Sequence, residues 1–273
     1  MKTIISNLLR HLGILFYTDK IRFYLHYIKK FKERRKFKKE NPLVSLPPSY
    51  LIYESFKLNY FKYYFDGRDS AIWLLDKLKR HKELKDINIL DWGCGPSRIV
   101  RHLPELLDKS CSIYGTDYNP KSIAWNRKAL MGINFNLNST NPPLPYVDSS
   151  FDIVYGISIF THLPEDLHYK WFNELVRITK KNGIVFLTLH GNVFKAKLTV
   201  PEQQVFDAGQ LIIKGNTKIG HRTYAAFHPN LFVHKLFSEH PIIEHIEGTL
   251  INGMPQQDVW IINVNKEKRE NNR

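Results

Sequence analysis

The stretch INILDWGCGPSRIV, residues 87–100, decides the fold of this chain. Its apolar first part, Ile87 to Trp92, predicts a buried strand. Gly93 and Gly95 then interrupt the strand, and glycine is the residue for a sharp turn or for a backbone that a ligand approaches closely. Pro96 suits the first turn of a helix. The stretch therefore predicts a strand, a turn that accepts a small ligand, and the start of a helix.

Beyond this stretch, strand and helix patterns alternate. The predicted strands are Ile87–Trp92, Ser112–Thr116, Asn134–Asn136, Phe151–Gly156 and Gly183–His190. The predicted helices between them are Ser97–Leu107, Lys121–Met131 and Asp166–Thr179. This alternation predicts an α/β fold with a doubly wound, mostly parallel sheet. Residues 241–264 read as two further strands with a short connection, so the closing strand is expected to be antiparallel.

The chain divides into four predicted regions. Residues 1–46 form a basic amphipathic helical extension, and residues 47–86 form a helical cap that follows a proline-rich break. Residues 87–265 form the main domain, with an insertion at about 191–232 that includes a predicted hairpin and covers a substrate. Residues 266–273 are expected to be a disordered tail.

Composition excludes several classes of protein. Aromatic residues make up 13% and hydrophobic residues 43% of the 273 residues, enough for a core. Cys94 and Cys111 fall at opposite edges of the predicted sheet, which excludes a disulfide and fits a reducing cytoplasm. They cannot build a metal cluster alone, and no metal is expected. No segment is long and apolar enough to span a membrane, and no signal peptide is recognised.

The net charge of +14 is concentrated near the N-terminus. Residues 1–40 hold twelve Lys and Arg residues and three acids, a formal charge of +9. One interpretation is a solvated helix face. The other is an arm that lies on an anionic membrane or an acidic partner.

Asp117 indicates a cofactor that contains a ribose. It ends the second predicted strand, and an acid there can accept hydrogen bonds from both ribose hydroxyls. By itself it could equally be a loop acid, as Asp91 could be a helix cap. The dinucleotide pattern GxGxxG has Arg98 in place of its third glycine. The sequence therefore favours a nucleoside cofactor without a pyrophosphate.

Four segments in order resemble class I S-adenosylmethionine-dependent methyltransferases. They are ILDWGCGPSR, YGTDYNP, LPYVDSSFDIVYGISIFTHL and RITKKNGIVFLTLHG. The resemblance implies a Rossmann-like fold with a seven-stranded sheet and S-adenosylmethionine as cofactor. Two later segments, YAAFHPNLF and GMPQQDVWIINV, resemble methyltransferases of bacterial surface-polysaccharide gene clusters more weakly.

The resemblance also implies roles for single residues. Asp91 would hold the methionine ammonium, Gly93 and Gly95 would let the cofactor approach the backbone, and Asp117 would bind the ribose. Tyr118 is either an adenine contact or a surface residue. The remaining implied cofactor contacts are Asn138 or Ser139 at the adenine amino group, and Ile157 and Ser158 at the methionine end.

Methyl transfer to a hydroxyl needs a general base, most often histidine or a carboxylate. His190 ends the fifth predicted strand and ranks first, ahead of His162 and His228; each could instead be structural. The segment NPPLPY, residues 141–146, resembles the NPPY signature of enzymes that methylate planar amino groups. It precedes the fourth predicted strand, where that signature does not belong, so a nucleobase amino group is disfavoured.

Three functions follow as hypotheses. The first is O-methylation of a sugar or lipid-linked glycan in polysaccharide biosynthesis, by a cytoplasmic protein peripheral to the inner membrane face. The second is RNA methylation through the basic arm, although the charge lies in one arm and no RNA-binding module is recognised. The third is a non-catalytic cofactor-binding scaffold.

Overall fold

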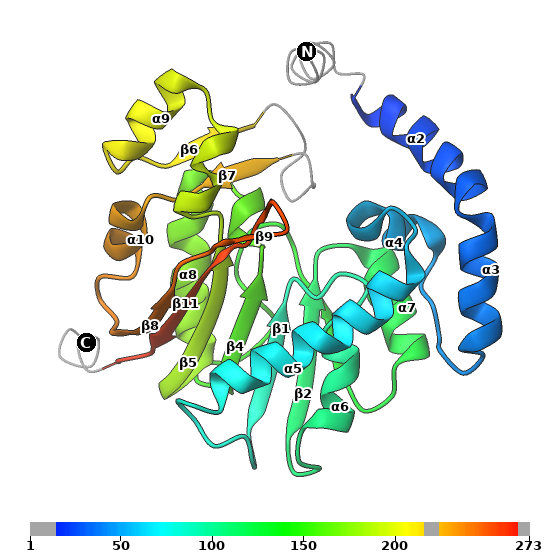
Figure 1. The fold of residues 1–273 in the computed structure, drawn as a ribbon. Helices are drawn as coiled ribbons and strands as arrows, with labels where there is room; N and C mark the ends of the chain where they lie inside the picture. Colours follow the sequence, from blue (N-terminus) through cyan, green and yellow to red (C-terminus); the bar gives the residue numbers. More distant parts are fainter. Residues whose placement is uncertain (1–14, 216–223, 267–273) are drawn as a thin grey trace.

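The computed structural model describes residues 15–215 and 224–266. Their centre is a seven-stranded sheet in the order β3-β2-β1-β4-β5-β11-β8 (Figure 1). The strands are β1 (Asn88–Trp92), β2 (Ser112–Asp117), β3 (Asn134–Leu137), β4 (Phe151–Ile157), β5 (Thr179–Leu189), β8 (Ile242–Ile246) and β11 (Asp258–Asn263). Strands β1 to β5 pair in parallel, whereas β11 is antiparallel to β5 and β8. This confirms the predicted doubly wound sheet and its antiparallel closing strand.

The helices connect and flank these strands. They are α2 (Leu15–Lys29), α3 (Phe31–Glu40), α4 (Ser49–Phe56), α5 (Gly67–Leu78), α6 (Leu103–Leu106), α7 (Pro120–Ala129), α8 (Glu165–Ile178), α9 (Val200–Asp207) and α10 (Asn230–Leu236). The described residues also form the π-helix η1 (Lys62–Asp66) and the 3-10 helices η2 (Val100–His102), η3 (Phe160–His162) and η4 (Asn192–Lys197). Within the described ranges, no helix is both long and apolar enough to cross a bilayer.

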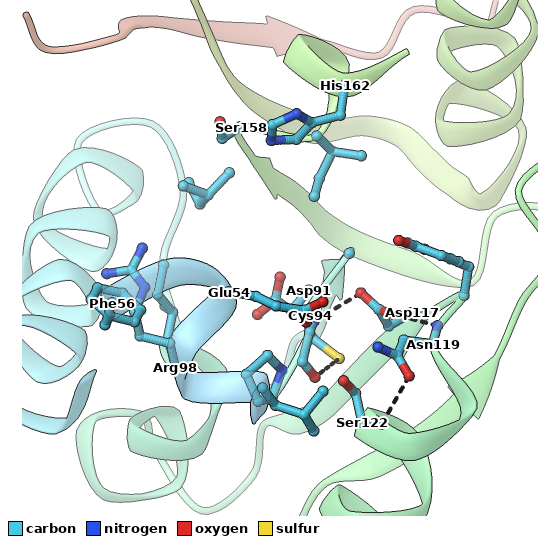
Figure 2. A pocket seen from close by; sticks show the side chains of 18 residues that line it. Glu54, Phe56, Asp91, Cys94, Arg98, Asp117, Asn119, Ser122, Ser158 and His162 are labelled. Atoms are coloured by element: carbon cyan, nitrogen blue, oxygen red, sulfur yellow. Dashed lines mark hydrogen bonds between the residues drawn. The ribbon is translucent and has the colours of Figure 1, made fainter. Parts of the chain in front are cut away.

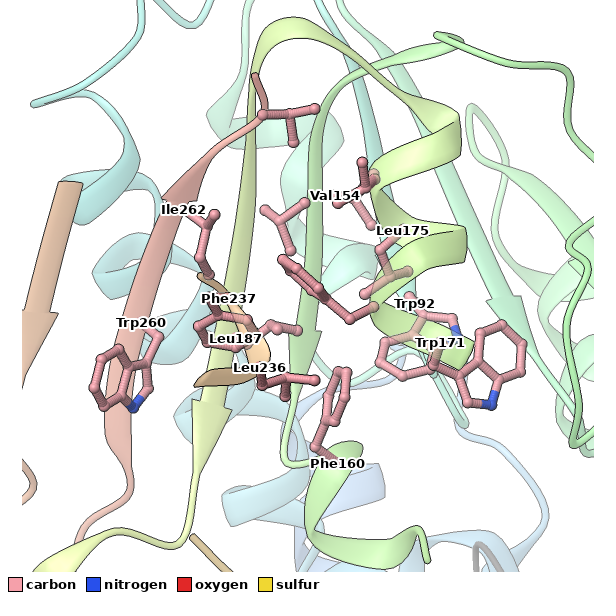
Figure 3. Close-up of a cluster of buried hydrophobic side chains, with 14 of the residues drawn as sticks. Trp92, Val154, Phe160, Trp171, Leu175, Leu187, Leu236, Phe237, Trp260 and Ile262 are labelled. Carbon is pink, nitrogen blue, oxygen red and sulfur yellow. The ribbon is translucent and has the colours of Figure 1, made fainter. Parts of the chain in front are cut away.

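Both faces of the sheet are buried, because alternate strand residues enter two separate cores. Leu90 and Val154 belong to the core on one face. Trp171 of α8 and Leu236 of α10 contribute to the same core (Figure 3). Neighbouring residues of the same strands, such as Ile89, point to the other face. There they pack against apolar side chains of α5 and α7.

The predicted helix Ser97–Leu107 is wrong in its first turn. Ser97 adopts a left-handed backbone with φ of 59°, so a helix cannot begin there. The segment instead passes through η2 before the short helix α6. The carbonyl of Pro96, expected inside a helix, accepts a hydrogen bond from the Tyr63 hydroxyl at 2.6 Å. The loop after β1 is therefore longer than its sequence suggested.

The N-terminal region packs around its own aromatic cluster. Phe37 of α3 is fully buried against residues that follow the proline-rich break, among them Ile52, Tyr53 and Tyr63. Helix α5, in contrast, packs on the sheet. The boundaries drawn from sequence at residues 46 and 86 stay predictions, as does the tail, since residues 267–273 lie outside the described ranges.

The insertion after β5 is more regular than its sequence indicated. It holds η4 and α9, and then two short antiparallel strands, β6 (Ile212–Lys214) and β7 (Ala225–Phe227). These strands occupy the two ends of the predicted hairpin, whose middle lies outside the described ranges. A second small pair, β9 (Leu250–Ile251) and β10 (Met254–Pro255), interrupts the connection between β8 and β11.

Two buried histidines attach the insertion to the main core. Nδ1–H of His168, on α8, donates to the Pro164 carbonyl at 2.9 Å. Its Nε2 is therefore bare and accepts from Nε2–H of His228, also at 2.9 Å. Both rings are fully buried. Burial lowers the pKa of His168 to about 4, and it lowers the pKa of His228 as well.

Because of this histidine pair, we expect the free energy of unfolding to decrease as the pH is lowered. Both folded pKa values lie below the ordinary value, so their contribution is complete above about pH 6.5 and is lost as pH falls toward 4. Between pH 7 and 5, His168 alone should reduce the free energy of unfolding by on the order of 2 kcal/mol. Urea unfolding at both pH values measures this.

The control for that measurement is the double variant His168→Phe/His228→Phe. Phenylalanine keeps the ring volume beside Phe160 and Phe232 but cannot titrate. The double variant should show a flatter dependence of stability on pH than the wild type. An unchanged slope would show that other groups cause the acid sensitivity.

Candidate active site

The loop after β1 is fastened to the end of β2. The backbone N–H groups of Gly93 and Cys94 both donate to the Thr116 carbonyl, at 2.8 and 2.9 Å. Gly93 has φ of +79°, and a Cβ there would lie 2.2 Å from Cδ1 of Ile159. Gly95 has φ of +49°, and a Cβ there would meet nothing within 4 Å. Gly95 therefore presents bare backbone to an open space.

Asp117 joins this loop through its carboxylate. Oδ2 accepts the N–H of Gly95 at 2.9 Å, and Oδ1 accepts the N–H of Asn119 at 2.7 Å. Burial raises the pKa of Asp117 to about 6, and the hydrogen bonds from these two N–H groups partly oppose this increase. Each carboxylate oxygen has a further lone pair, so the group can still accept hydrogen bonds from a diol.

Asp91 and Arg98 line the same cavity beside the loop. Burial raises the pKa of Asp91 to about 7, and the positive charge of Arg98 partly opposes this increase. The Arg98 guanidinium donates to Ser70 Oγ at 2.7 Å, which fixes its position. A carboxylate and a guanidinium together can bind the ammonium and carboxylate of an amino acid. In the sequence, Arg98 stood out only as the residue that replaces the third glycine of the dinucleotide pattern, and nothing there indicated that it lines a cavity.

A cavity of about 430 Å³ is lined by Asp91, Gly93, Gly95, Arg98 and Asp117 (Figure 2). Its wall also includes Ile157 and Ser158 at the end of β4, as the sequence predicted. Helix α4 supplies three lining residues that the sequence analysis missed, Leu51, Glu54 and Phe56. The only signal for them was the aromatic-rich composition of the predicted cap. Such a composition does not say which side chains face a ligand.

A smaller cavity of about 70 Å³ adjoins the first. Its lining includes Tyr118, Asn138 and Ser139, the three predicted adenine contacts. The Asn138 side chain is oriented by Thr116, whose hydroxyl donates to Asn138 Oδ1 at 2.7 Å. The two cavities share Asp117, Tyr118 and Gly93 in their linings, so they are neighbours at the end of β2.

Ser158 is held in a strained backbone at the cavity. Its φ is 65°, and its N–H donates to Thr188 Oγ1 at 2.8 Å. Gln257 binds both hydroxyls of this network: its Nε2 donates to Ser158 Oγ at 2.7 Å and its Oε1 accepts from Thr188 at 2.6 Å. Strained residues that neighbours hold in this way cluster at functional sites. Thr188 and Gln257 lie in the quoted segments RITKKNGIVFLTLHG and GMPQQDVWIINV, but the sequence predicted no role for either residue.

The structure separates the three candidate histidines. His162 lines both cavities, and its Nδ1–H donates to the Tyr224 carbonyl at 2.9 Å. His190 donates to the Ala226 carbonyl at 3.1 Å and stacks on Phe194, outside both linings. His228 is fully buried on His168. The sequence ranking that placed His190 first is therefore not supported by this geometry, and His228 cannot reach a ligand.

Two carboxylates that could have replaced a histidine base have structural roles. Glu202 caps α9 through the N–H of Thr199 and pairs with Lys214. Asp258 accepts the N–H of Gly248 at 2.9 Å and contacts His245 at 3.1 Å. Among the residues lining the larger cavity, His162 is the one histidine. Within the described ranges, no group of histidine, cysteine or acidic residues could hold a metal ion.

Comparisons with known proteins agree with this geometry. A family model described as a methyltransferase domain matches residues 89–183. A curated relative, ajmaline N-methyltransferase of Rauvolfia serpentina, is 27% identical over 153 residues. The match covers 54% of this chain, and the chain spans about half the length of that relative, 49%. Residues 89–183 are therefore similar to a methyltransferase domain.

Solved structures share the fold at low sequence identity. A methyltransferase from Methanosarcina mazei matches with a TM-score of 0.54 and 19% identity, over 70% of this chain and 98% of that one. Magnesium protoporphyrin IX methyltransferase from Synechocystis PCC 6803, solved with bound SAH, matches with a TM-score of 0.54 and 12% identity. That match covers 96% of this chain and 99% of the other. The predicted class I methyltransferase fold is thus confirmed.

We predict that Asp117→Ala weakens binding of S-adenosylhomocysteine. The change removes one to two hydrogen bonds to a buried carboxylate, worth on the order of 2–4 kcal/mol of binding free energy. Calorimetric titration measures the loss, and Asp108→Ala, which removes an exposed acid elsewhere, is the control. Unchanged affinity in a folded Asp117→Ala protein would exclude the ribose assignment.

Gly95→Val should abolish that binding, because its side chain would enter the cavity. Gly132→Val is a matched control: Gly132 also has a positive φ, +76°, and a Cβ there also meets nothing within 4 Å. It lies outside both cavity linings. The two variants therefore carry similar backbone strain, and only Gly95→Val should lose the ligand. Equal affinities in the two variants would contradict this placement of the cofactor.

Proposed function

We propose, from its place among the class I S-adenosylmethionine-dependent methyltransferases, that this chain methylates a hydroxyl group of a sugar or lipid-linked glycan. The observation that carries the proposal is that Asp117 and His162 line the same cavity. Asp117 is suited to bind a ribose, and His162 is suited to accept a proton. In this assignment the protein acts in the synthesis of surface polysaccharide.

S-adenosylmethionine is the cofactor that fits the lining. Asp91 and Arg98 match the ammonium and carboxylate of its methionine part, and Asp117 matches its ribose diol. Tyr118 and Asn138 in the smaller cavity match its adenine, and the bare backbone at Gly95 leaves room for close approach. When bound, the cofactor supplies an electrophilic methyl group on a sulfonium. Burial raises the pKa of Asp91 to about 7, and a cation bound nearby would favour the ionised form of this carboxyl group.

His162 is the proposed general base in place of His190. Its Nδ1–H is directed at the Tyr224 carbonyl, so Nε2 carries the lone pair that can accept the acceptor's hydroxyl proton. Burial lowers the pKa of His162, which keeps the imidazole neutral at neutral pH. Residues Ser158 and Gln257 support the neighbouring wall, and α4 limits access of water. Positioning of the acceptor against the cofactor and exclusion of water supply the rest of the rate acceleration.

The choice of a glycan acceptor rests on sequence resemblance in the tail, at YAAFHPNLF and GMPQQDVWIINV. A small amine is the second candidate, because the curated relative is named as an N-methyltransferase. Glu54 in the cavity wall would attract an ammonium or protonated amine. Incubation with labelled S-adenosylmethionine and either envelope glycans or a panel of small amines distinguishes them. Label in the amines alone would overturn the glycan assignment.

We expect His162→Ala to lower turnover by about 10²–10⁴, the usual contribution of a general base. Its affinity for S-adenosylhomocysteine should change little. His190→Ala, which alters a histidine outside the site, is the matched control and should retain near-normal turnover. Single-turnover kinetics with either accepted substrate measures both. A large loss in His190→Ala together with near-normal turnover in His162→Ala would return the role to His190.

A further inference from the structure

Helix α2 presents a stripe of large apolar side chains to solvent. Ile21, Tyr24, Leu25 and Ile28 are 61%, 63%, 61% and 74% exposed. Their spacings of three and four residues place them on one side of the helix. Phe31, at the start of α3, continues the stripe and is 56% exposed. We refer to these five residues as the α2 stripe.

The opposite side of α2 is fixed to the rest of the protein. The Phe23 ring packs edge-on against Tyr50 and Tyr53 of α4, with ring centroids 5.3 and 5.4 Å apart. Arg34 of α3 donates to the Tyr27 carbonyl at 2.7 Å, which joins α2 to α3. The helix therefore cannot rotate to bury the α2 stripe without breaking these contacts. Figure 1 shows both helices at the periphery of the molecule.

Positive charge surrounds the α2 stripe. Residues 20–40 hold ten Lys and Arg residues but only two acids, Glu33 and Glu40. Both acids pair within the segment, with Lys30 at 2.7 Å and Lys36 at 3.8 Å. On a helical projection, Lys20 lies on one side of the stripe, and Arg22 and Lys29 lie on the other. An apolar stripe between basic flanks is the pattern of helices that lie in a lipid interface.

We propose that α2 binds the surface of a bilayer containing anionic phospholipid. The α2 stripe enters the boundary between headgroups and acyl chains, and the basic flanks contact the lipid phosphates. Charge complementarity selects this occupant. A second copy of the chain would bring two strongly basic segments together. A nucleic acid would match the charge but leave the apolar side chains in water.

The surface lies close to the candidate active site. Phe23 of α2 contacts Tyr50 and Tyr53, and the same helix α4 supplies Leu51 and Glu54 to the cavity wall. A protein held through α2 would therefore keep this wall near the bilayer. Lipid binding itself depends only on the α2 stripe and its charges. It does not depend on the methyl transfer proposed above.

The test uses the full chain and vesicles of neutral phosphatidylcholine, with or without phosphatidylglycerol. Co-sedimentation should detect binding only to the anionic vesicles, and added salt should weaken it. Leu25→Glu/Ile28→Glu removes two stripe residues and should reduce binding by at least about ten-fold. Met131→Glu/Val200→Glu is the control; it makes the same charge change at side chains that are 85% and 70% exposed elsewhere. It should bind within about two-fold of the wild type.

Two results would overturn the proposal. One is absence of wild-type binding to anionic vesicles. The other is an equal loss of binding in both double variants, which would show that the change in charge alone, and not the loss of the α2 stripe, weakens binding. Light scattering and a salt titration with RNA identify a second copy or a nucleic acid as the occupant instead. Titration with S-adenosylhomocysteine on the same samples reports the cofactor site separately. Loss of lipid binding with intact cofactor binding would therefore leave the proposed function standing.

Discussion

The candidate site depends on three backbone N–H groups that join the loop after β1 to the end of β2. Gly93 and Cys94 donate to the Thr116 carbonyl, and Gly95 donates to the Asp117 carboxylate. These bonds hold the loop open and orient the carboxylate at the same time. They require positive φ at two positions, which glycine adopts without strain. The parallel order of β1, β2 and β4 then brings Asp91, Asp117 and Ser158 to one sheet edge.

The segments outside the matched methyltransferase domain complete this edge from two directions. Helix α4 precedes the sheet in sequence and closes one side of the larger cavity with Leu51, Glu54 and Phe56. The insertion after β5 supplies Tyr224, whose carbonyl orients His162. Buried His168 and His228 hold that insertion against α8. In the proposed function, these segments, which carry little family signature, would determine which acceptor can enter and which histidine meets it.

The sequence predicted the parts of the structure that repeat or that have few alternatives. Strand positions followed from apolar runs, and the predicted cofactor residues Gly93, Gly95 and Asp117 lie together in one cavity lining. Prediction from the sequence failed where tertiary contacts override the local sequence pattern. Ser97 takes a left-handed backbone in a segment with helical composition. His190 and His162 both follow strands in sequence, and only the packing of Phe194 and Tyr224 separates them. The presence of Arg98 in the cavity lining beside Asp91 could be seen only in the fold.

The most direct test of this account is a crystal structure of the full chain with S-adenosylhomocysteine. The account predicts the ribose hydroxyls on the Asp117 carboxylate, the adenine beside Tyr118 and Asn138, and the methionine part between Asp91 and Arg98. The sulfur should face the part of the cavity that His162 lines. A ligand bound elsewhere, or one whose sulfur lies on the side of the cavity away from His162, would contradict it.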